Sequence, residues 1–169
     1  KLHLLEFEVR DHAHTPIGTF ILRERAEPVA GVIELTLDHQ FLMSSTVTVS
    51  ERALSTRAIA MHGGTDLEVM VGGLGLGYTA KAALDSGRVA NIDVVEYVQS
   101  IIDWVARGLI PLGKELVVDP RYHPIHGDVF ERLGGTVEKT YDVLLIDVDH
   151  SPDERLGETS DSFYGHAKL

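Results

Sequence analysis

The chain of 169 residues is long enough for one domain with a small appendage, and its apolar fraction of 44% suits a packed globule. A formal net charge of −11 argues against a general nucleic-acid binder, and the lack of cysteines excludes disulfides, thiolate metal sites and a cysteine nucleophile. No apolar run approaches membrane-spanning length, so we expect a cytoplasmic protein with neither a membrane nor a nucleic-acid partner.

Polar and apolar residues alternate in the first part of the chain, which is typical of strands with one buried face. Turns are expected from Asp11 to Pro16 and at Asp38-His39, between strands of a three- or four-stranded meander. We therefore predict a small antiparallel β unit over residues 1–49 and a second domain over residues 50–169.

Strands and helices alternate in the second part of the chain. A helix is expected from a cap at Ser50 to Gly63-Gly64, and residues 109–121 are expected to be a connector. The strands are predicted at 67–71, 90–95, 122–126 and 141–146, and the later helices at 78–84, 98–105 and from 130. This alternation predicts an α/β fold, a Rossmann-like doubly wound parallel sheet.

A glycine-rich turn follows the first strand of this sheet. Gly73, Gly75 and Gly77 occupy every second position, which allows a ligand to approach the backbone and the N-terminus of the next helix. A dinucleotide fingerprint would need its third glycine at Tyr78, and a P-loop would need Lys-Ser/Thr after Gly77. The remaining G-x-G-x-G pattern resembles the first motif of S-adenosylmethionine-type methyltransferase folds.

Acidic residues stand at the predicted carboxyl ends of the other strands, where open parallel sheets bind ligands. Glu96 can accept both hydroxyl protons of a ribose, and Asp128 points into the same crevice. Asp147 and Asp149 form an acidic pair that can hold a cationic amine and accept its proton. Tyr97 follows Glu96 and packs either on a nucleoside or in the core.

Seven segments together resemble the spermidine synthase family of polyamine aminopropyltransferases. Four resemble motifs of the whole family: Val71 to Thr79, Val94-Val-Glu96, Gly127-Asp128 and Tyr141 to Asp147. The segments Phe41 to Ser45 with Ser50 to Leu54, and Asp147 to Pro152, resemble motifs of its bacterial spermidine-synthase-like branch.

The resemblance implies a class I methyltransferase-type fold that binds decarboxylated S-adenosylmethionine or, in a related activity, S-adenosylmethionine itself. The implied reaction transfers an aminopropyl group to putrescine or a similar polyamine substrate and releases methylthioadenosine. Carried over by motif, Glu96 binds the ribose, Asp128 binds the adenine amino group and Asp147 deprotonates the attacking amine. A homodimer is also expected.

Three positions depart from the pattern of the family. Leu76 stands where the glycine motif usually carries an aspartate that holds the aminopropyl amine, and Val98 replaces an aspartate two residues beyond Glu96. His150 takes the place of a second polyamine-binding acid, with Asp149 as the neighbouring substitute. The alternatives are therefore an S-adenosylmethionine-dependent methyltransferase and a non-catalytic nucleoside-binding or assembly protein.

Proteins of this fold normally continue into three more strands. We therefore expect either a C-terminally truncated fragment or a second chain that covers the edge at residues 143–146. His123 and His126, and the cluster of Asp147, Asp149 and His150, raise the alternative of a metal site. No metal is expected, because His123 and His126 do not share a face of a strand and the nine histidines are scattered without a ligand pattern. A Ser-His-Asp hydrolase is set aside because the sequence contains no G-x-S-x-G elbow.

Overall fold

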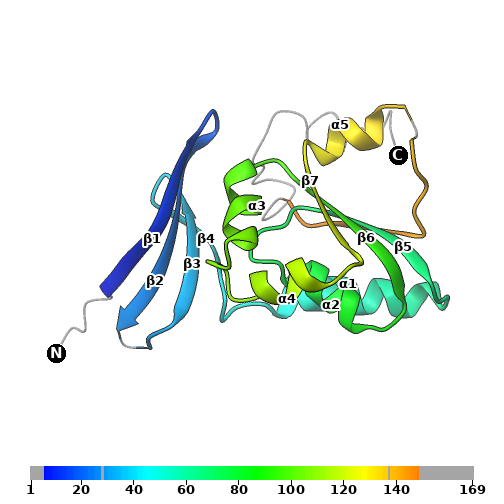
Figure 1. Cartoon of the computed structure of the whole chain (residues 1–169), viewed down its shortest axis with the longest axis horizontal. Helices are drawn as coiled ribbons and strands as arrows, with labels where there is room; N and C mark the ends of the chain where they lie inside the picture. Colours follow the sequence, from blue (N-terminus) through cyan, green and yellow to red (C-terminus); the bar gives the residue numbers. More distant parts are fainter. Residues whose placement is uncertain (1–5, 28, 137, 149–169) are drawn as a thin grey trace.

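A computed structural model describes residues 6–27, 29–136 and 138–148. The described residues form two four-stranded sheets, one antiparallel and one parallel, with helices packed against the parallel sheet (Figure 1). The predicted α/β architecture, a parallel sheet preceded by an antiparallel unit, is confirmed. Among the described residues, no helix is both long and apolar enough to cross a membrane.

The antiparallel sheet is a meander in the order β1-β2-β3-β4. Its strands are β1 (Glu6–Thr15), β2 (Gly18–Glu27), β3 (Val32–Leu37) and β4 (Gln40–Ser44). Asp38 and His39 both have positive φ, of 47° and 68°, as a two-residue hairpin turn requires. The predicted turn from Asp11 to Pro16 is wrong, because β1 continues to Thr15 and pairs with β2 up to Gly18.

The parallel sheet has the order β7-β6-β5-β8. Its strands are β5 (Leu67–Gly72), β6 (Val89–Glu96), β7 (Tyr122–His126) and β8 (Val143–Ile146), and every neighbouring pair is parallel. Pro124 lies in β7 at one edge of the sheet, where a missing backbone donor is tolerated. Within the described residues, β8 forms the other edge.

Five helices connect the strands of the described part of the chain. They are α1 (Val49–His62), α2 (Tyr78–Asp85), α3 (Gln99–Ala106), α4 (Gly113–Val118) and α5 (Val129–Gly134). The predicted cap at Ser50 is wrong, because α1 begins one residue earlier with Thr48 at its cap, while Gly63 ends the helix with φ of 78° as expected. The predicted connector at 109–121 contains α4, which is held in place by the fully buried Leu116.

One continuous core joins the two sheets. The inner face of the antiparallel sheet contributes Phe20, Leu22 and Leu35 to the same buried cluster as Val69 and Val71 of β5. Helices α1, α2 and α4 lie on this side of the parallel sheet, and α5 lies on the other (Figure 1). The indole N–H of Trp104 in α3 also donates to Asp11 of β1 at 3.0 Å. The antiparallel sheet is therefore packed firmly beside the ends of the parallel strands.

Candidate functional site

The carboxyl ends of the four parallel strands are joined by backbone hydrogen bonds into one continuous rim. Asp147 N donates to Gly72 O at 2.8 Å, and Gly73 N donates to Val95 O at 2.8 Å. Gly127 N completes the row by donating to Glu96 O at 3.0 Å. The sequence-predicted site residues of β5, β6, β7 and β8 therefore lie along a single edge of the sheet.

The glycine turn after β5 has the backbone conformation that its spacing predicted. Gly73, Gly75 and Gly77 have positive φ of 92°, 50° and 87°. A Cβ on Gly73 would lie 2.2 Å from Asp147 O, so the turn and the end of β8 approach more closely than any side chain would allow. A Cβ on Gly75 would lie 2.7 Å from Met43 Sδ, so the side chain of Met43 in β4 packs directly against the turn.

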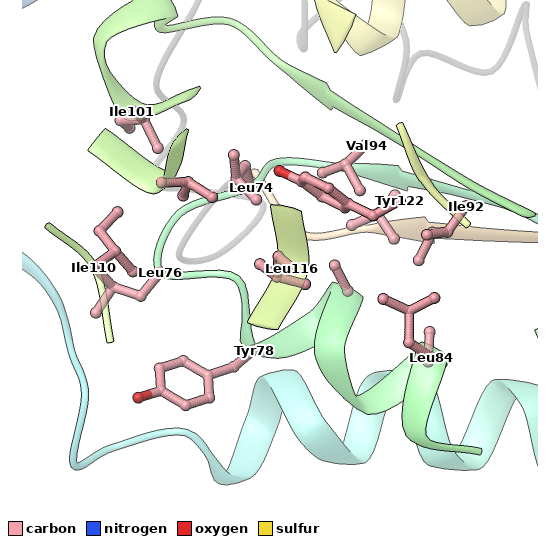
Figure 2. Packing of buried hydrophobic residues seen from close by; sticks show 14 of the residues in the cluster. Leu74, Leu76, Tyr78, Leu84, Ile92, Val94, Ile101, Ile110, Leu116 and Tyr122 are labelled. Atoms are coloured by element: carbon pink, nitrogen blue, oxygen red, sulfur yellow. The ribbon is translucent and has the colours of Figure 1, made fainter. Parts of the chain in front are cut away.

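The two leucines of the turn are part of the core. Leu74 and Leu76 are only 4% and 3% exposed, in the buried cluster with Ile110 and Leu116 (Figure 2). At the position where the sequence resemblance implies an aspartate, Leu76 thus has a buried hydrocarbon side chain. The turn itself contributes no acid to the site.

Glu96 at the end of β6 is buried and faces the glycine turn. Its Oε2 accepts from Leu74 N at 2.8 Å and from Gly75 N at 3.4 Å, and its Oε1 accepts from Val98 N at 2.9 Å. Burial raises the pKa of Glu96, and these backbone N–H groups oppose the increase. The carboxylate therefore fixes the shape of the turn at the place where the ribose is expected.

Asp128 and Tyr97 lie further along the rim. Asp128 is the N-cap of α5, and its Oδ1 accepts from Phe130 N at 2.8 Å and from Glu131 N at 3.3 Å. Tyr97 is 51% exposed, which agrees with packing on a bound nucleoside and rules out the alternative of a core contact. The phenol ring therefore lies open to solvent beside Glu96.

Asp147 follows β8 and is positioned by a buried hydroxyl. Thr79 Oγ1 in the first turn of α2 donates to Asp147 Oδ2 at 2.5 Å. Thr79 is only 2% exposed, and its backbone oxygen accepts from Ser55 Oγ of α1 at 2.6 Å. Two helices and the neighbouring strand thus fix the carboxylate, as a reacting group requires.

A pocket of about 220 Å³ lies beside Asp147. The glycine turn from Leu74 to Gly77 forms one wall, and Thr79 and Asp147 form another. The remaining lining comes from β4 and the start of α1: Leu42, Met43, Ser44, Ser50 and Glu51, with Tyr78 and Val148. Since one water occupies about 30 Å³, the pocket has room for a short aliphatic group.

Sequence reasoning missed three residues of this pocket region. Thr79, Ser55 and Glu51 come from helices whose packing on the rim is visible only in three dimensions. The expected substrate-binding residues Asp149 and His150 lie outside the described residues. Within the part of the chain that the structure describes, no group of three or more His, Cys, Asp or Glu side chains forms a metal site.

Comparisons with known proteins found likenesses in structure but none in sequence. No protein-family model and no curated protein matches the sequence. The structure is similar to a spermidine synthase in complex with the transition-state analogue AdoDATO, with a TM-score of 0.70 and 18% identity over 87% of this chain and 55% of that chain. It is also similar to the spermidine synthase from Thermotoga maritima, with a TM-score of 0.71 and 18% identity over 91% of this chain and 56% of that chain.

These two likenesses concern the fold. The chain spans little more than half the length of either synthase, and the identity is 18% in both comparisons. The parallel sheet, its glycine turn and the preceding antiparallel sheet together have the methyltransferase-like architecture of spermidine synthases.

Proposed function

We propose that this chain belongs to a transferase that moves an aminopropyl group from decarboxylated S-adenosylmethionine to a polyamine such as putrescine. One observation carries the proposal. The pocket at the ends of β5 and β8 is lined by the glycine turn and by Asp147, whose carboxylate accepts a hydrogen bond from Thr79. The solved structures of similar fold are spermidine synthases, one of them bound to a transition-state analogue.

In the proposed reaction, Asp147 accepts a proton from the ammonium group of the polyamine. The freed nitrogen lone pair attacks the aminopropyl carbon that is bonded to the sulfonium sulfur. The new C–N bond forms as the C–S bond breaks, and the sulfur leaves as the neutral thioether methylthioadenosine. Because the leaving group is already activated by its positive charge, alignment of the nucleophile and removal of its proton are the main tasks of the protein.

The nucleoside half of the cosubstrate is proposed to lie along the rim from β5 to β7. Glu96 is the proposed acceptor for the ribose hydroxyls, and Asp128 is proposed to contact the adenine amino group. Glu96 accepts backbone N–H groups at both carboxylate oxygens, so a bound ribose shares this carboxylate with the glycine turn. Tyr97, half exposed beside it, offers a surface for stacking.

A second candidate function is methyl transfer from S-adenosylmethionine. The buried Leu76 favours it, because this side chain neither holds an aminopropyl ammonium nor repels the carboxylate of S-adenosylmethionine. Both functions use the same glycine turn and the same Glu96. They differ in whether the amino-acid end of the cosubstrate carries its carboxylate.

The test of the proposal is the Asp147→Asn variant. The amide keeps the shape of the side chain but cannot accept the proton, so we expect aminopropyl transfer to fall at least about a hundredfold. Binding of methylthioadenosine, measured by titration calorimetry, should remain because this ligand does not need the base. Asp66→Asn, an exposed position with φ of 54° that suits asparagine, is the control. Full turnover in Asp147→Asn would refute the proposed base.

A further inference from the structure

The pocket beside Asp147 contains a second carboxylate that the glycine motif does not supply. Glu51 lies in the first turn of α1, is partly buried and lines the same pocket as Asp147. Glu51 belongs to α1, whereas Asp147 directly follows β8. They give the pocket two negative charges in addition to the hydroxyls of Ser50 and Thr79.

The Glu51 carboxylate has one hydrogen-bond partner from the pocket lining, the hydroxyl of Ser50. Ser50 Oγ donates to Glu51 Oε2 at 2.8 Å, which leaves Oε1 available for a ligand at the pocket wall. Burial is the main cause that raises the pKa of the Tyr78 hydroxyl, and the negative charge of Glu51 adds to it while Arg52 opposes it. Glu51 therefore acts electrostatically on Tyr78, which lines the pocket as well.

The described lining of the pocket includes no basic side chain to neutralise these acids. The nearest basic neighbour in sequence, Arg52, donates from Nε to Thr48 Oγ1 at 3.1 Å, and its guanidinium lies 5.1 Å from the centre of the Tyr78 ring. Lys81 of α2 is paired with Asp85 and with Glu115 at 3.3 Å. A pocket with two acids and no lining cation favours a ligand group that carries positive charge.

We propose that Glu51 binds the primary ammonium of the cosubstrate's aminopropyl group, in place of the acid that is absent at Leu76. This inference rests on the proposed function and assigns a residue that selects the decarboxylated cosubstrate. The ammonium forms a charge-assisted hydrogen bond with the Glu51 carboxylate. The carboxylate of S-adenosylmethionine would meet the negative charges of both Glu51 and Asp147, so the same residue disfavours methyl transfer.

The experiment compares Glu51→Gln with the wild-type chain in titrations with three ligands. Decarboxylated S-adenosylmethionine carries the ammonium alone, S-adenosylmethionine carries the ammonium and the carboxylate, and methylthioadenosine carries neither. For Glu51→Gln we expect affinity for the decarboxylated form to fall roughly tenfold or more, since hydrogen bonds to charged groups contribute that much. Affinity for methylthioadenosine should stay within about twofold, because that ligand does not reach Glu51.

Two further variants keep the result specific. Ser50→Ala removes the donor that orients Glu51 and should give a smaller loss with the same ligand selectivity. Glu8→Gln removes an equal charge from a side chain of β1 that is 71% exposed, and should change no affinity. Thermal unfolding of each variant checks that the fold is retained.

The outcomes separate this inference from the proposed function. If the wild-type chain prefers the decarboxylated ligand and Glu51→Gln keeps that preference, the assignment of Glu51 is overturned while aminopropyl transfer stands. If the wild-type chain prefers S-adenosylmethionine, or binds none of the three ligands, the proposed function fails first and the assignment fails with it. A selective loss in Glu51→Gln, with methylthioadenosine binding intact, supports both.

Discussion

Replacement of Gly73 by alanine tests the close approach between the glycine turn and β8. Gly73 has φ of 92°, and an added Cβ would lie 2.2 Å from the backbone oxygen of Asp147. The left-handed backbone conformation costs alanine about 1–2 kcal/mol, and forcing an extra carbon into a packed site costs about 1–3 kcal/mol. We therefore expect Gly73→Ala to lower the free energy of unfolding by roughly 2–5 kcal/mol.

The control for this variant is Gly87→Ala. Gly87 also has a positive φ, of 68°, but nothing lies within 4 Å of its added Cβ. This substitution therefore carries only the conformational cost, about 1–2 kcal/mol. The difference between the two variants, about 1–3 kcal/mol, isolates the steric contact with β8.

Urea denaturation followed by tryptophan fluorescence measures both variants. The chain has a single tryptophan, Trp104, which is 2% exposed and reports the loss of the shared core. Because Gly73 packs against Asp147, we also expect Gly73→Ala to displace Asp147 and to reduce aminopropyl transfer by the molecules that remain folded. Gly87→Ala should leave aminopropyl transfer by the folded molecules unchanged. Equal destabilisation by the two substitutions would refute the close approach on which the site geometry depends.

Two other residues of the rim give predictions of different kinds. Thr79→Val keeps the side-chain shape but removes the hydrogen bond to Asp147, so we expect turnover to fall about tenfold or more, with Thr79→Ser near the wild-type rate. Equal rates for the valine and serine variants, measured in steady-state assays, would argue against a positioning role. Because burial raises the pKa of Glu96, the folded chain binds this proton more tightly than the unfolded chain does. The tighter proton binding stabilises the folded chain. This stabilisation is fully present below 4.5, the ordinary pKa of a glutamate side chain, and is lost as the pH rises through the pKa of Glu96 in the folded chain. The unfolding free energy of the wild-type chain relative to Glu96→Gln should therefore fall with rising pH in urea denaturation between pH 4 and 7, and a rise would contradict the sign. We also expect Glu96→Gln to weaken methylthioadenosine binding, and an unchanged affinity would count against the ribose role.

Local patterns were sufficient to predict the strands and the glycine turn. The mostly apolar run from Leu67 to Val71 indicates a strand covered on both faces. The three alternating glycines permit the positive φ that the turn adopts. The position of Glu96 at the end of β6 was predictable from the apolar pattern of that strand. These features depend on neighbours in sequence, so the sequence alone contains their signal.

Features that depend on distant packing were not predictable in the same way. Helix α4 has six residues and no full apolar period, and it is stabilised by the burial of Leu116 against Gly77. The partner of Asp147 is Thr79, which is 68 residues away in sequence. The role of Asp128 as a helix cap did have a local signal, because Glu131 follows three residues later.

The approach of α1 to the pocket was also invisible in the sequence. Glu51 stands beside Ser50 in a segment that sequence reasoning used to start a helix and to support the family resemblance. Its place in the pocket depends on how β4 and α1 pass over the glycine turn, which the contact between Met43 and Gly75 reflects.

The central claim is aminopropyl transfer, and product analysis tests it most directly. The chain is incubated with decarboxylated S-adenosylmethionine and putrescine, and the mixture is analysed by mass spectrometry. Aminopropyl transfer gives equal amounts of methylthioadenosine and a polyamine longer by one aminopropyl unit, and we expect neither product from Asp147→Asn. A methylated product from S-adenosylmethionine, with no aminopropyl product from the decarboxylated form, would contradict it.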